Sequence, residues 1–230
     1  MMTGSPLLYY ITDRTAFPGD ERARCLRLLD KISEAATAGV RYIQLREKDL
    51  CTRALESLAR EAILVIRNCN NLKLENRELG TALLINSRTD VALSVEARGV
   101  HIPANDISAI DVRQIWKCGA GTLARETSPT DLVVSVACHS PEEVTRAASN
   151  DATLVLFAPV FEKKGVSGTT PTGLAALRQA CHAKVPVIAL GGITLQNADS
   201  CLRAGAAGIA AIRLFQENKI DEVVRRLGER

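Results

Sequence analysis

A short apolar run followed by an amphipathic stretch recurs along the whole chain, and this alternation constrains the fold more than any other feature. Runs with little polar interruption, such as LVVSVA at 132–137, are typical of strands buried on both faces of a parallel sheet. The stretches between them place apolar residues at spacings of three and four, which predicts helices. The predicted strands are Leu7–Thr12, Tyr42–Arg46, Ala82–Asn86, Gly99–Ile102, Leu132–Ala137, Leu154–Val160, Val185–Gly191 and Gly208–Phe215. The predicted helices are Ala23–Ala38, Thr52–Cys69, Arg88–Glu96, Pro141–Ala148 and Leu195–Ala204.

Repeated strand–helix units of this kind form either an open doubly wound sheet or a closed barrel. The repeat is even from end to end, and no G-x-G-x-x-G fingerprint follows the first predicted strand, so the barrel is favoured. The 230 residues suit a barrel with short loops, since about 250 is typical. We expect an α/β fold, a (β/α)₈ TIM barrel, as a single domain over residues 1–230. The irregular stretch Glu162–Gly173 is expected to be a mobile loop over the barrel mouth.

Composition and charge exclude several classes of function. A formal net charge of +3, scattered Lys and Arg, and few aromatic residues provide neither a basic patch nor a stacking platform for nucleic acid. No apolar stretch approaches the roughly 18 residues of a membrane span, and the first residues lack a signal-peptide pattern. The seven cysteines are dispersed without a C-x-x-C pair, which indicates neither zinc nor disulfides. We expect a cytoplasmic protein with reduced thiols and no nucleic-acid or membrane partner.

Polar residues that close the predicted strands are the candidates for function, because TIM-barrel active sites lie at the carboxyl ends of the strands. The motif QLREK (44–48) closes the second predicted strand. Side chains alternate along a strand, so Gln44, Arg46 and Lys48 share one face. If that face lines the barrel, an amide and two cations converge on its mouth, which suits an anionic ligand. The alternative places Lys48 in the loop and Arg46 in an ion pair with a neighbouring carboxylate.

Two polar residues close the third and fourth predicted strands. Asn86 is suited to hydrogen-bond a heterocycle or to cap the helix that follows it. His101 is positioned to serve as a ligand or proton carrier, or as a buried structural histidine. Asp106, a few residues later, could bind Mg²⁺, since hard cations prefer oxygen ligands, or could cap the next helix.

The fifth predicted strand leads into SVACHS (135–140). Ser135 and His139 share a parity, so Ser135 is expected to line the barrel with His139 at its rim. His139 is the best general acid/base candidate, because an imidazole titrates near neutral pH. Cys138 points to the opposite face, which argues against a Cys138–His139 dyad.

The ends of the last two predicted strands indicate a phosphate site, which this fold usually builds from these loops. Gly191 and Gly192 allow a phosphate to approach the backbone, and a helix expected directly after them offers free N–H groups. Arg213 adds a cation near the same place or pairs with an acidic residue.

The strand-end motifs form an ordered set: QLREK (44–48), LLIN (83–86), GVHI (99–102), SVACHS (135–140), LFAPVF (156–161) and ALGGIT (189–194). From Tyr9 to about Phe215 this set resembles thiamine phosphate synthase and its relative TenI, a thiazole tautomerase. The resemblance implies a TIM-barrel enzyme of the cytoplasm whose partners are small phosphorylated heterocycles. It implies that Ser135 lies near the pyrimidine, and that Gly191 and Gly192 hold the thiazole phosphate through backbone N–H groups. The residues that it assigns to the pyrimidine diphosphate are Gln44, Arg46, Lys48 and Asn86.

The synthase reaction implied by this resemblance couples a pyrimidine diphosphate to a thiazole phosphate. Loss of diphosphate leaves a pyrimidine methyl cation, which the thiazole nitrogen captures. Mg²⁺ and basic groups stabilise the departing anion, and Arg46 and Lys48 suit that role. We therefore predict a transferase with Mg²⁺ as its cofactor.

Three features differ from the synthase pattern. Ser87 stands where the pattern has an Asp that binds Mg²⁺, which leaves Asp106 as the matching carboxylate. Lys163 and Lys164 lie in a loop that usually grips phosphate through Thr or Ser, and they are expected to replace it electrostatically. Arg213 stands where a Ser is usual, next to the thiazole phosphate.

These differences leave other functions open. A thiazole tautomerase would use His139 as a proton carrier and would need no metal. A non-catalytic binder of phosphorylated ligands is motivated by Ser87. An unrelated phosphate-binding barrel enzyme is a further alternative, against which the ordered QLREK and SVACHS motifs count. The intact QLREK cluster favours the synthase, and a homo-oligomer is compatible with the sequence.

Overall fold

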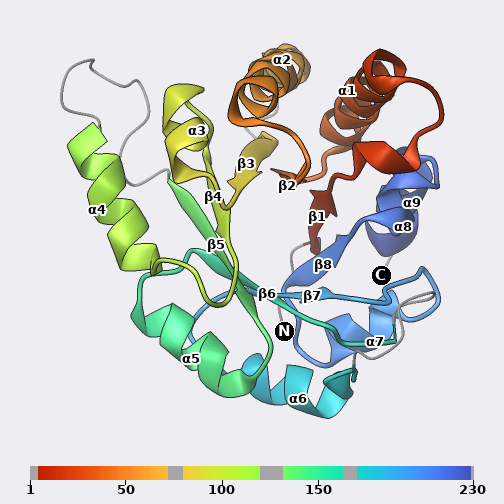
Figure 1. Cartoon of the computed structure of the whole chain (residues 1–230). Coiled ribbons are helices and arrows are strands. Elements are labelled where there is room, and N and C mark those ends of the chain that lie inside the picture. Colours follow the sequence, from red (N-terminus) through yellow and green to blue (C-terminus); the bar gives the residue numbers. More distant parts are fainter. Residues whose placement is uncertain (1–4, 72–79, 120–131, 163–169, 229–230) are drawn as a thin grey trace.

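The computed structural model describes residues 5–71, 80–119, 132–162 and 170–228. Its strands pair in parallel and in sequence order, and the last strand pairs with the first to close a barrel (Figure 1). The predicted (β/α)₈ TIM barrel is thereby confirmed. The strands are β1 (Leu7–Ile11), β2 (Tyr42–Leu45), β3 (Ala82–Asn86), β4 (Gly99–Ile102), β5 (Val133–Cys138), β6 (Leu154–Phe157), β7 (Val187–Leu190) and β8 (Gly208–Ala211).

Helices surround the barrel and connect successive strands (Figure 1). They are η1 (Arg14–Ala16), α1 (Glu21–Ala38), α2 (Thr52–Asn71), α3 (Thr89–Ser94), α4 (Ala109–Gly119), α5 (Pro141–Ser149), α6 (Gly173–Ala180), α7 (Ala198–Arg203), α8 (Arg213–Gln216) and α9 (Ile220–Gly228). The Asp20 carboxylate caps α1 by accepting from the Ala23 N–H at 2.8 Å. Ser140 caps α5 in the same manner, through the N–H of Glu143. Such caps satisfy N–H groups that have no partner inside the helix.

Three predicted boundaries differ from the structure by three or more residues, and the other differences are of one or two residues. The last strand ends at Ala211 instead of Phe215. Leu214 and Phe215 are buried residues of the short helix α8, which follows the strand. A short apolar run does not by itself distinguish a strand from a buried helix. Strand β6 ends at Phe157, before Pro159, whose nitrogen has no hydrogen to donate to a ladder. Helix α7 begins only at Ala198, after a turn that precedes it.

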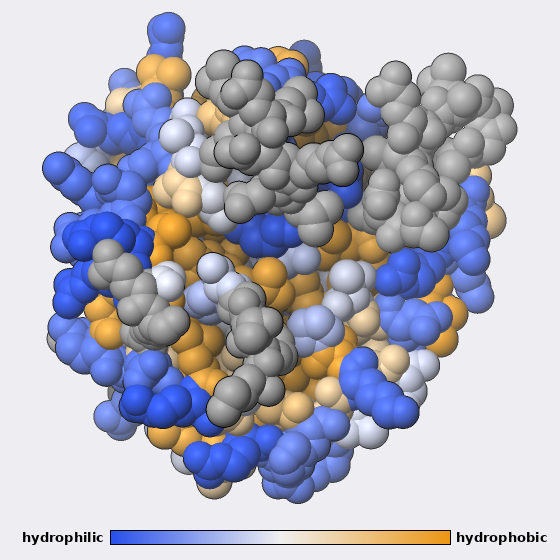
Figure 2. Space-filling model, turned by 180° about the vertical axis from the view of Figure 1, so that it is seen from behind, coloured by the Kyte–Doolittle hydropathy of each residue, from blue (hydrophilic) through white to orange (hydrophobic). Residues whose placement is uncertain are grey.

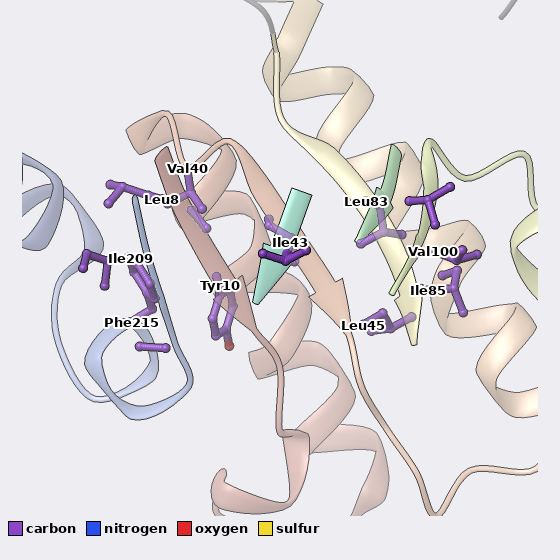
Figure 3. Packing of buried hydrophobic residues seen from close by; sticks show 14 of the residues in the cluster. Leu8, Tyr10, Val40, Ile43, Leu45, Leu83, Ile85, Val100, Ile209 and Phe215 are labelled. Carbon is purple, nitrogen blue, oxygen red and sulfur yellow. The ribbon is translucent and has the colours of Figure 1, made fainter. Parts of the chain in front are cut away.

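The core has two layers, one inside the barrel and one between the strands and the helices. The residues inside the barrel include Tyr9, Tyr42, Leu84, Leu154 and Leu156. The alternate residues of the same strands face outward and pack against the helices. Figure 3 shows part of this outer layer, which contains Leu8, Tyr10, Val40, Ile43, Leu45, Leu83, Ile85, Val100, Ile209 and Phe215.

Figure 2 shows the face opposite to that of Figure 1, on which hydrophilic residues cluster at the periphery and hydrophobic ones reach the surface between them. Among the described residues, every helix is too short or too polar to cross a membrane.

Candidate active site at the carboxyl ends of the strands

Three of the predicted polar residues form a row across neighbouring strands inside the barrel. In the strand register Asn86 of β3 lies beside His101 of β4, which lies beside Ser135 of β5. Each strand presents alternate residues inward, so all three side chains belong to the same face and the same level. Ser135 is fully buried and His101 is 7% exposed. The sequence separates these residues by tens of positions, and the barrel brings them together.

Gln44 joins this row from β2. Its Nε2 donates to Oδ1 of Asn86 at 2.8 Å, although the side chain is only 1% exposed. Its Oε1 is buried and accepts no hydrogen bond within the described part of the chain. Since a buried acceptor without a donor costs free energy, this oxygen is suited to receive a donor from a ligand.

Asn86 does not cap the following helix, so that alternative is wrong. Its Nδ2 donates to the Ser87 hydroxyl at 3.1 Å, and α3 starts beyond Arg88 with no side-chain cap. Ser87 itself adopts a left-handed conformation, with φ of 61°. Asn86 is therefore free of a helix-capping role and is held by its two side-chain neighbours, Gln44 and Ser87.

His101 is kept neutral by its surroundings. Its Nδ1 lies 3.0 Å from Oγ of Ser135, which also accepts from the Tyr9 hydroxyl at 3.5 Å. Burial, together with the smaller effect of the nearby positive charge of Arg46, lowers the pKa of His101 to about 3. The ring is therefore an uncharged hydrogen-bonding group at neutral pH.

This depressed pKa predicts a dependence of stability on pH. The unfolded chain has an ordinary histidine, which binds a proton below about pH 6.5, while the folded chain takes one up only near pH 3. The contribution is therefore complete above about pH 6.5 and is lost as the pH falls, by about 2 kcal/mol at pH 5. Urea unfolding at pH 7.5 and 5.0 should show a smaller loss in His101→Gln than in the parent. Equal losses of unfolding free energy in the two proteins would contradict the role of His101 in this pH dependence.

Arg46 and Lys48 lie at the mouth, directly after β2. The Arg46 side chain is partly exposed, and its backbone N–H donates to the Thr12 hydroxyl at 3.0 Å. The alternative of an ion pair is not supported, because no carboxylate of the described chain lies within 4.0 Å of the Arg46 guanidinium. Lys48 is exposed in the loop, as the alternative reading expected. A partly desolvated cation without a carboxylate beside it is suited to bind an anion.

His139 lies at the rim just after β5, with an exposed side chain. Its Nδ1 lies 2.6 Å from the Ala158 carbonyl oxygen, which can only accept, so Nδ1 carries the hydrogen. Nε2 then remains for a ligand. Cys138 is buried among the outer core, where burial raises the pKa of its thiol to about 12. Cys138 thus lies in the outer core while His139 lies at the rim, which agrees with the prediction that the two do not form a catalytic dyad.

Gly191 and Gly192 follow β7 in backbone conformations that favour glycine, with φ of 100° and 64°. A Cβ on Gly191 would lie 2.7 Å from Cα of Pro159, and one on Gly192 would overlap the Glu162 carbonyl oxygen. No helix follows directly, contrary to the prediction. Instead Asn197 holds the turn, since its Oδ1 accepts from Thr194 N–H at 2.8 Å and its Nδ2 donates to the Gly192 carbonyl at 2.9 Å.

The remaining predicted site residues are not part of the polar row inside the barrel. Arg213 begins α8 instead of lying in a strand, and its side chain is exposed. Lys163 and Lys164 lie outside the described residues, as does most of the Glu162–Gly173 loop. Asp106 is exposed beside a cavity of about 200 Å³ that Glu143 and Arg146 also line.

Within the described residues, Asp106 is not part of a preassembled metal site. It does not cap α4, because Ser108 and Asp111 bond to each other there. Among the described residues, the Asp106 carboxylate accepts a hydrogen bond only from the adjacent Ile107 N–H. Across the ranges that the structure describes, no group of three His, Cys, Asp or Glu is placed to hold a metal.

A sequence model of the family described as thiamine monophosphate synthase matches residues 8–215. The chain belongs to this family. The match removes the alternative of an unrelated phosphate-binding barrel.

Individual members of the thiamine monophosphate synthase family are similar over nearly the whole chain. The thiamine-phosphate synthase of Roseiflexus castenholzii is 38% identical, over 91% of this chain and 81% of its own. That of Syntrophomonas wolfei is 31% identical, over 99% and 97%. The solved structure of a thiamine phosphate pyrophosphorylase from Pyrococcus furiosus superposes with a TM-score of 0.73 at 25% identity, covering 97% of this chain and 94% of that one.

Sequence reasoning missed a buried charged cluster beneath the QLREK turn of this family member. Glu47, which stands between Arg46 and Lys48 in the sequence, is buried and bonds Arg14 and Thr12. The alternation that placed Arg46 on one face also placed Glu47 on the other, so that much of the signal was present. The partner Arg14 lies 33 residues earlier, and nothing local in the sequence indicates it.

Proposed function

We propose that this protein is a thiamine phosphate synthase, a transferase that couples a hydroxymethylpyrimidine diphosphate to a thiazole phosphate and releases diphosphate. The observation that carries the proposal is one arrangement at the barrel mouth. An uncharged polar row of Gln44, Asn86, His101 and Ser135 lies below the partly buried cation Arg46. A substrate with a neutral heterocycle and an anionic tail fits that division. The family membership and the named relatives support the same assignment.

Each part of the row has a task in the proposed reaction. Gln44 Oε1 would accept from a donor on the pyrimidine ring, since it has no other described donor. The bond from the pyrimidine methylene carbon to the diphosphate oxygen breaks, and the electron pair leaves with the diphosphate. Arg46 and Lys48 would stabilise that developing negative charge. The neutral His101 adds no positive charge beside the pyrimidine methyl cation. The thiazole nitrogen then forms the new carbon–nitrogen bond.

Mg²⁺ belongs to this proposal as an ion that enters with the diphosphate. Mg²⁺ is commonly held by one or two carboxylates together with substrate phosphates and water. The single exposed carboxylate of Asp106 fits that mode, and it does not fit a cage made of protein ligands alone. When bound, the ion would neutralise charge on the leaving diphosphate.

The thiazole phosphate would bind at the opposite side of the mouth. Gly191 and Gly192 leave room for a phosphate at the backbone, and Arg213, Lys163 and Lys164 would supply positive charge around it. Binding of small phosphorylated heterocycles and a cytoplasmic location are both part of the proposal.

The test is formation of thiamine phosphate from the two purified substrates, with Mg²⁺ and with EDTA. Product that depends on Mg²⁺ supports the synthase and shows that Ser87 is tolerated. Absence of product in both conditions would overturn the proposal. The thiazole tautomerase would then be assayed next, because His139 presents Nε2 at the rim.

Gln44→Leu is expected to raise the KM for the pyrimidine diphosphate by about 10- to 100-fold, since the lost amide leaves polar groups unpaired. The KM for the thiazole phosphate should change less than about twofold, since Gln44 lies on the pyrimidine side. Steady-state kinetics with each substrate varied in turn measures both. An unchanged KM for the pyrimidine diphosphate, or equal rises for both substrates, would remove Gln44 from the pyrimidine site.

A further inference from the structure

A buried cluster of charged residues lies directly beneath the loop that carries Arg46 and Lys48. The side chains of Arg14 and Glu47 are 3% and 1% exposed. The Glu47 carboxylate accepts from the Thr12 hydroxyl at 2.5 Å, from the Arg14 N–H at 3.0 Å and from Arg14 Nη1 at 3.2 Å. Arg14 comes from η1, after β1, and Glu47 follows β2, so the cluster ties two neighbouring loops together.

Arg14 also holds a second residue of the same loop. Its Nη1 and Nη2 donate to the two carboxylate oxygens of Asp49, each at 2.7 Å. These hydrogen bonds to Asp49 raise the pKa of the Arg14 guanidinium, and they lower the pKa of the Asp49 carboxyl. Glu47 and Asp49 flank Lys48 in the sequence. The Arg14 guanidinium therefore bonds the residues on both sides of Lys48, while Lys48 itself stays exposed.

The same cluster reaches Arg46 through Thr12. The Thr12 hydroxyl donates to Glu47 and accepts from the backbone N–H of Arg46. The Thr12 N–H in turn donates to the Gln44 carbonyl at 3.0 Å. Hydrogen bonds thus hold this segment at Gln44, Arg46, Glu47 and Asp49. Glu47 is buried in the cluster, while Arg46 lies partly exposed at the mouth.

Stability alone does not account for this cluster. A buried ion pair contributes little net free energy of folding, because the desolvation of both charges offsets their attraction. A fixed loop does have a consequence for binding, because a cation that is already oriented loses less conformational entropy when an anion arrives. The planar guanidinium of Arg14 can engage two carboxylates at once, which a lysine ammonium cannot do in the same geometry.

We propose that Arg14 is a positioning residue for the diphosphate site, acting through Glu47 and Asp49 to orient Arg46 and Lys48. The inference rests on the proposed function, in which Arg46 and Lys48 bind the diphosphate of the pyrimidine substrate. Arg14 itself is buried, with a side-chain exposure of 3%, and acts in this proposal only through these two carboxylates.

The experiment compares the full-length parent with Arg14→Lys, Asp49→Asn and Glu21→Gln. Arg14→Lys keeps the charge and loses the two-pronged contact, and Asp49→Asn weakens the same contact from the loop. Glu21→Gln is the matched control, because Glu21 also bonds Arg14, at 2.6 Å through Nε, but belongs to α1 and not to the loop. Circular dichroism first establishes that each variant is folded.

The expected result is a selective change in one Michaelis constant. Arg14→Lys and Asp49→Asn should raise the KM for the pyrimidine diphosphate about tenfold, with the KM for the thiazole phosphate within about twofold of the parent. Glu21→Gln should leave both constants within about twofold. Equal rises in both constants, a loss confined to kcat, or an equal effect of Glu21→Gln would overturn the positioning role.

Calorimetric titration with inorganic diphosphate separates this inference from the proposed function. A parent that forms no thiamine phosphate refutes the function, and the titration then tests the positioning role alone. About tenfold weaker diphosphate binding by Asp49→Asn than by Glu21→Gln supports it. Equal affinity of these two variants, or no binding by the parent, overturns it.

Discussion

Arg46→Ala is expected to lower kcat for thiamine phosphate formation by about 100- to 1000-fold, the usual cost of removing one donor aimed at developing charge. The guanidinium lies at the mouth above the neutral row and has no described carboxylate partner. Its charge is therefore available to the departing diphosphate. Single-turnover kinetics measures the chemical step without a contribution from product release.

Three control variants make this expectation specific. Arg46→Lys should lose about tenfold, because an ammonium retains the charge but not the planar pair of donors. Lys48→Ala should also lower the coupling rate, and His139→Ala should change it by less than about threefold. A tautomerase would reverse the order, with His139→Ala the most damaging. An unchanged rate in Arg46→Ala, Lys48→Ala and His139→Ala would exclude both assignments.

Arg14→Met is expected to destabilise the folded protein by about 3–5 kcal/mol. The Glu47 carboxylate has a side-chain exposure of 1%. Without the guanidinium it keeps, among the described donors, only the Thr12 hydroxyl and one backbone N–H. A buried anion without a cation carries its desolvation cost uncompensated. The free energy of unfolding in urea at neutral pH measures the effect.

Removing the other partner of the pair, in Glu47→Met, should lower the free energy of unfolding by less. In Glu47→Met the Arg14 guanidinium still bonds Asp49 and Glu21, whose carboxylates are more than half exposed. We expect a loss of about 1–2 kcal/mol, and the double variant should be close to Glu47→Met because no buried charge is left alone. Additive losses in the double variant would show that the two side chains contribute independently, contrary to this account.

The sequence contained enough information to predict the barrel and most of the polar row. Buried parallel strands are nearly continuous apolar runs, and the fold itself dictates that function lies at their carboxyl ends. Alternation then selects the inward residues, so Gln44, His101 and Ser135 were identifiable without knowing their neighbours. Helix α9 was equally visible in principle, because its buried residues Ile220 and Val223 show helical spacing.

Other features depend on contacts that the sequence does not specify. Helix α8 has four residues, about one turn, which is too few for a periodic pattern to emerge. The hydrogen bonds from Arg14 to Glu47 and Asp49 join residues of two loops. The local sequence is equally compatible with many other pairings of charged residues. The turn after Gly192 is set by Asn197, whose amide captures backbone groups before α7 can begin.

The pairing of β1 with β8 also has a consequence for how the chain folds. Leu7 and Gly208 are partners in the barrel although nearly the whole sequence separates them. Closing such a large loop costs entropy before any contact repays it, so we expect slow folding, with the last step sealing the seam between β1 and β8. Tyr9, which donates to Ser135 at the base of the polar row, lies on one side of that seam. Without β8, Tyr9 lacks Ala210, one of its two strand neighbours, so we expect the polar row to become rigid only when the barrel closes.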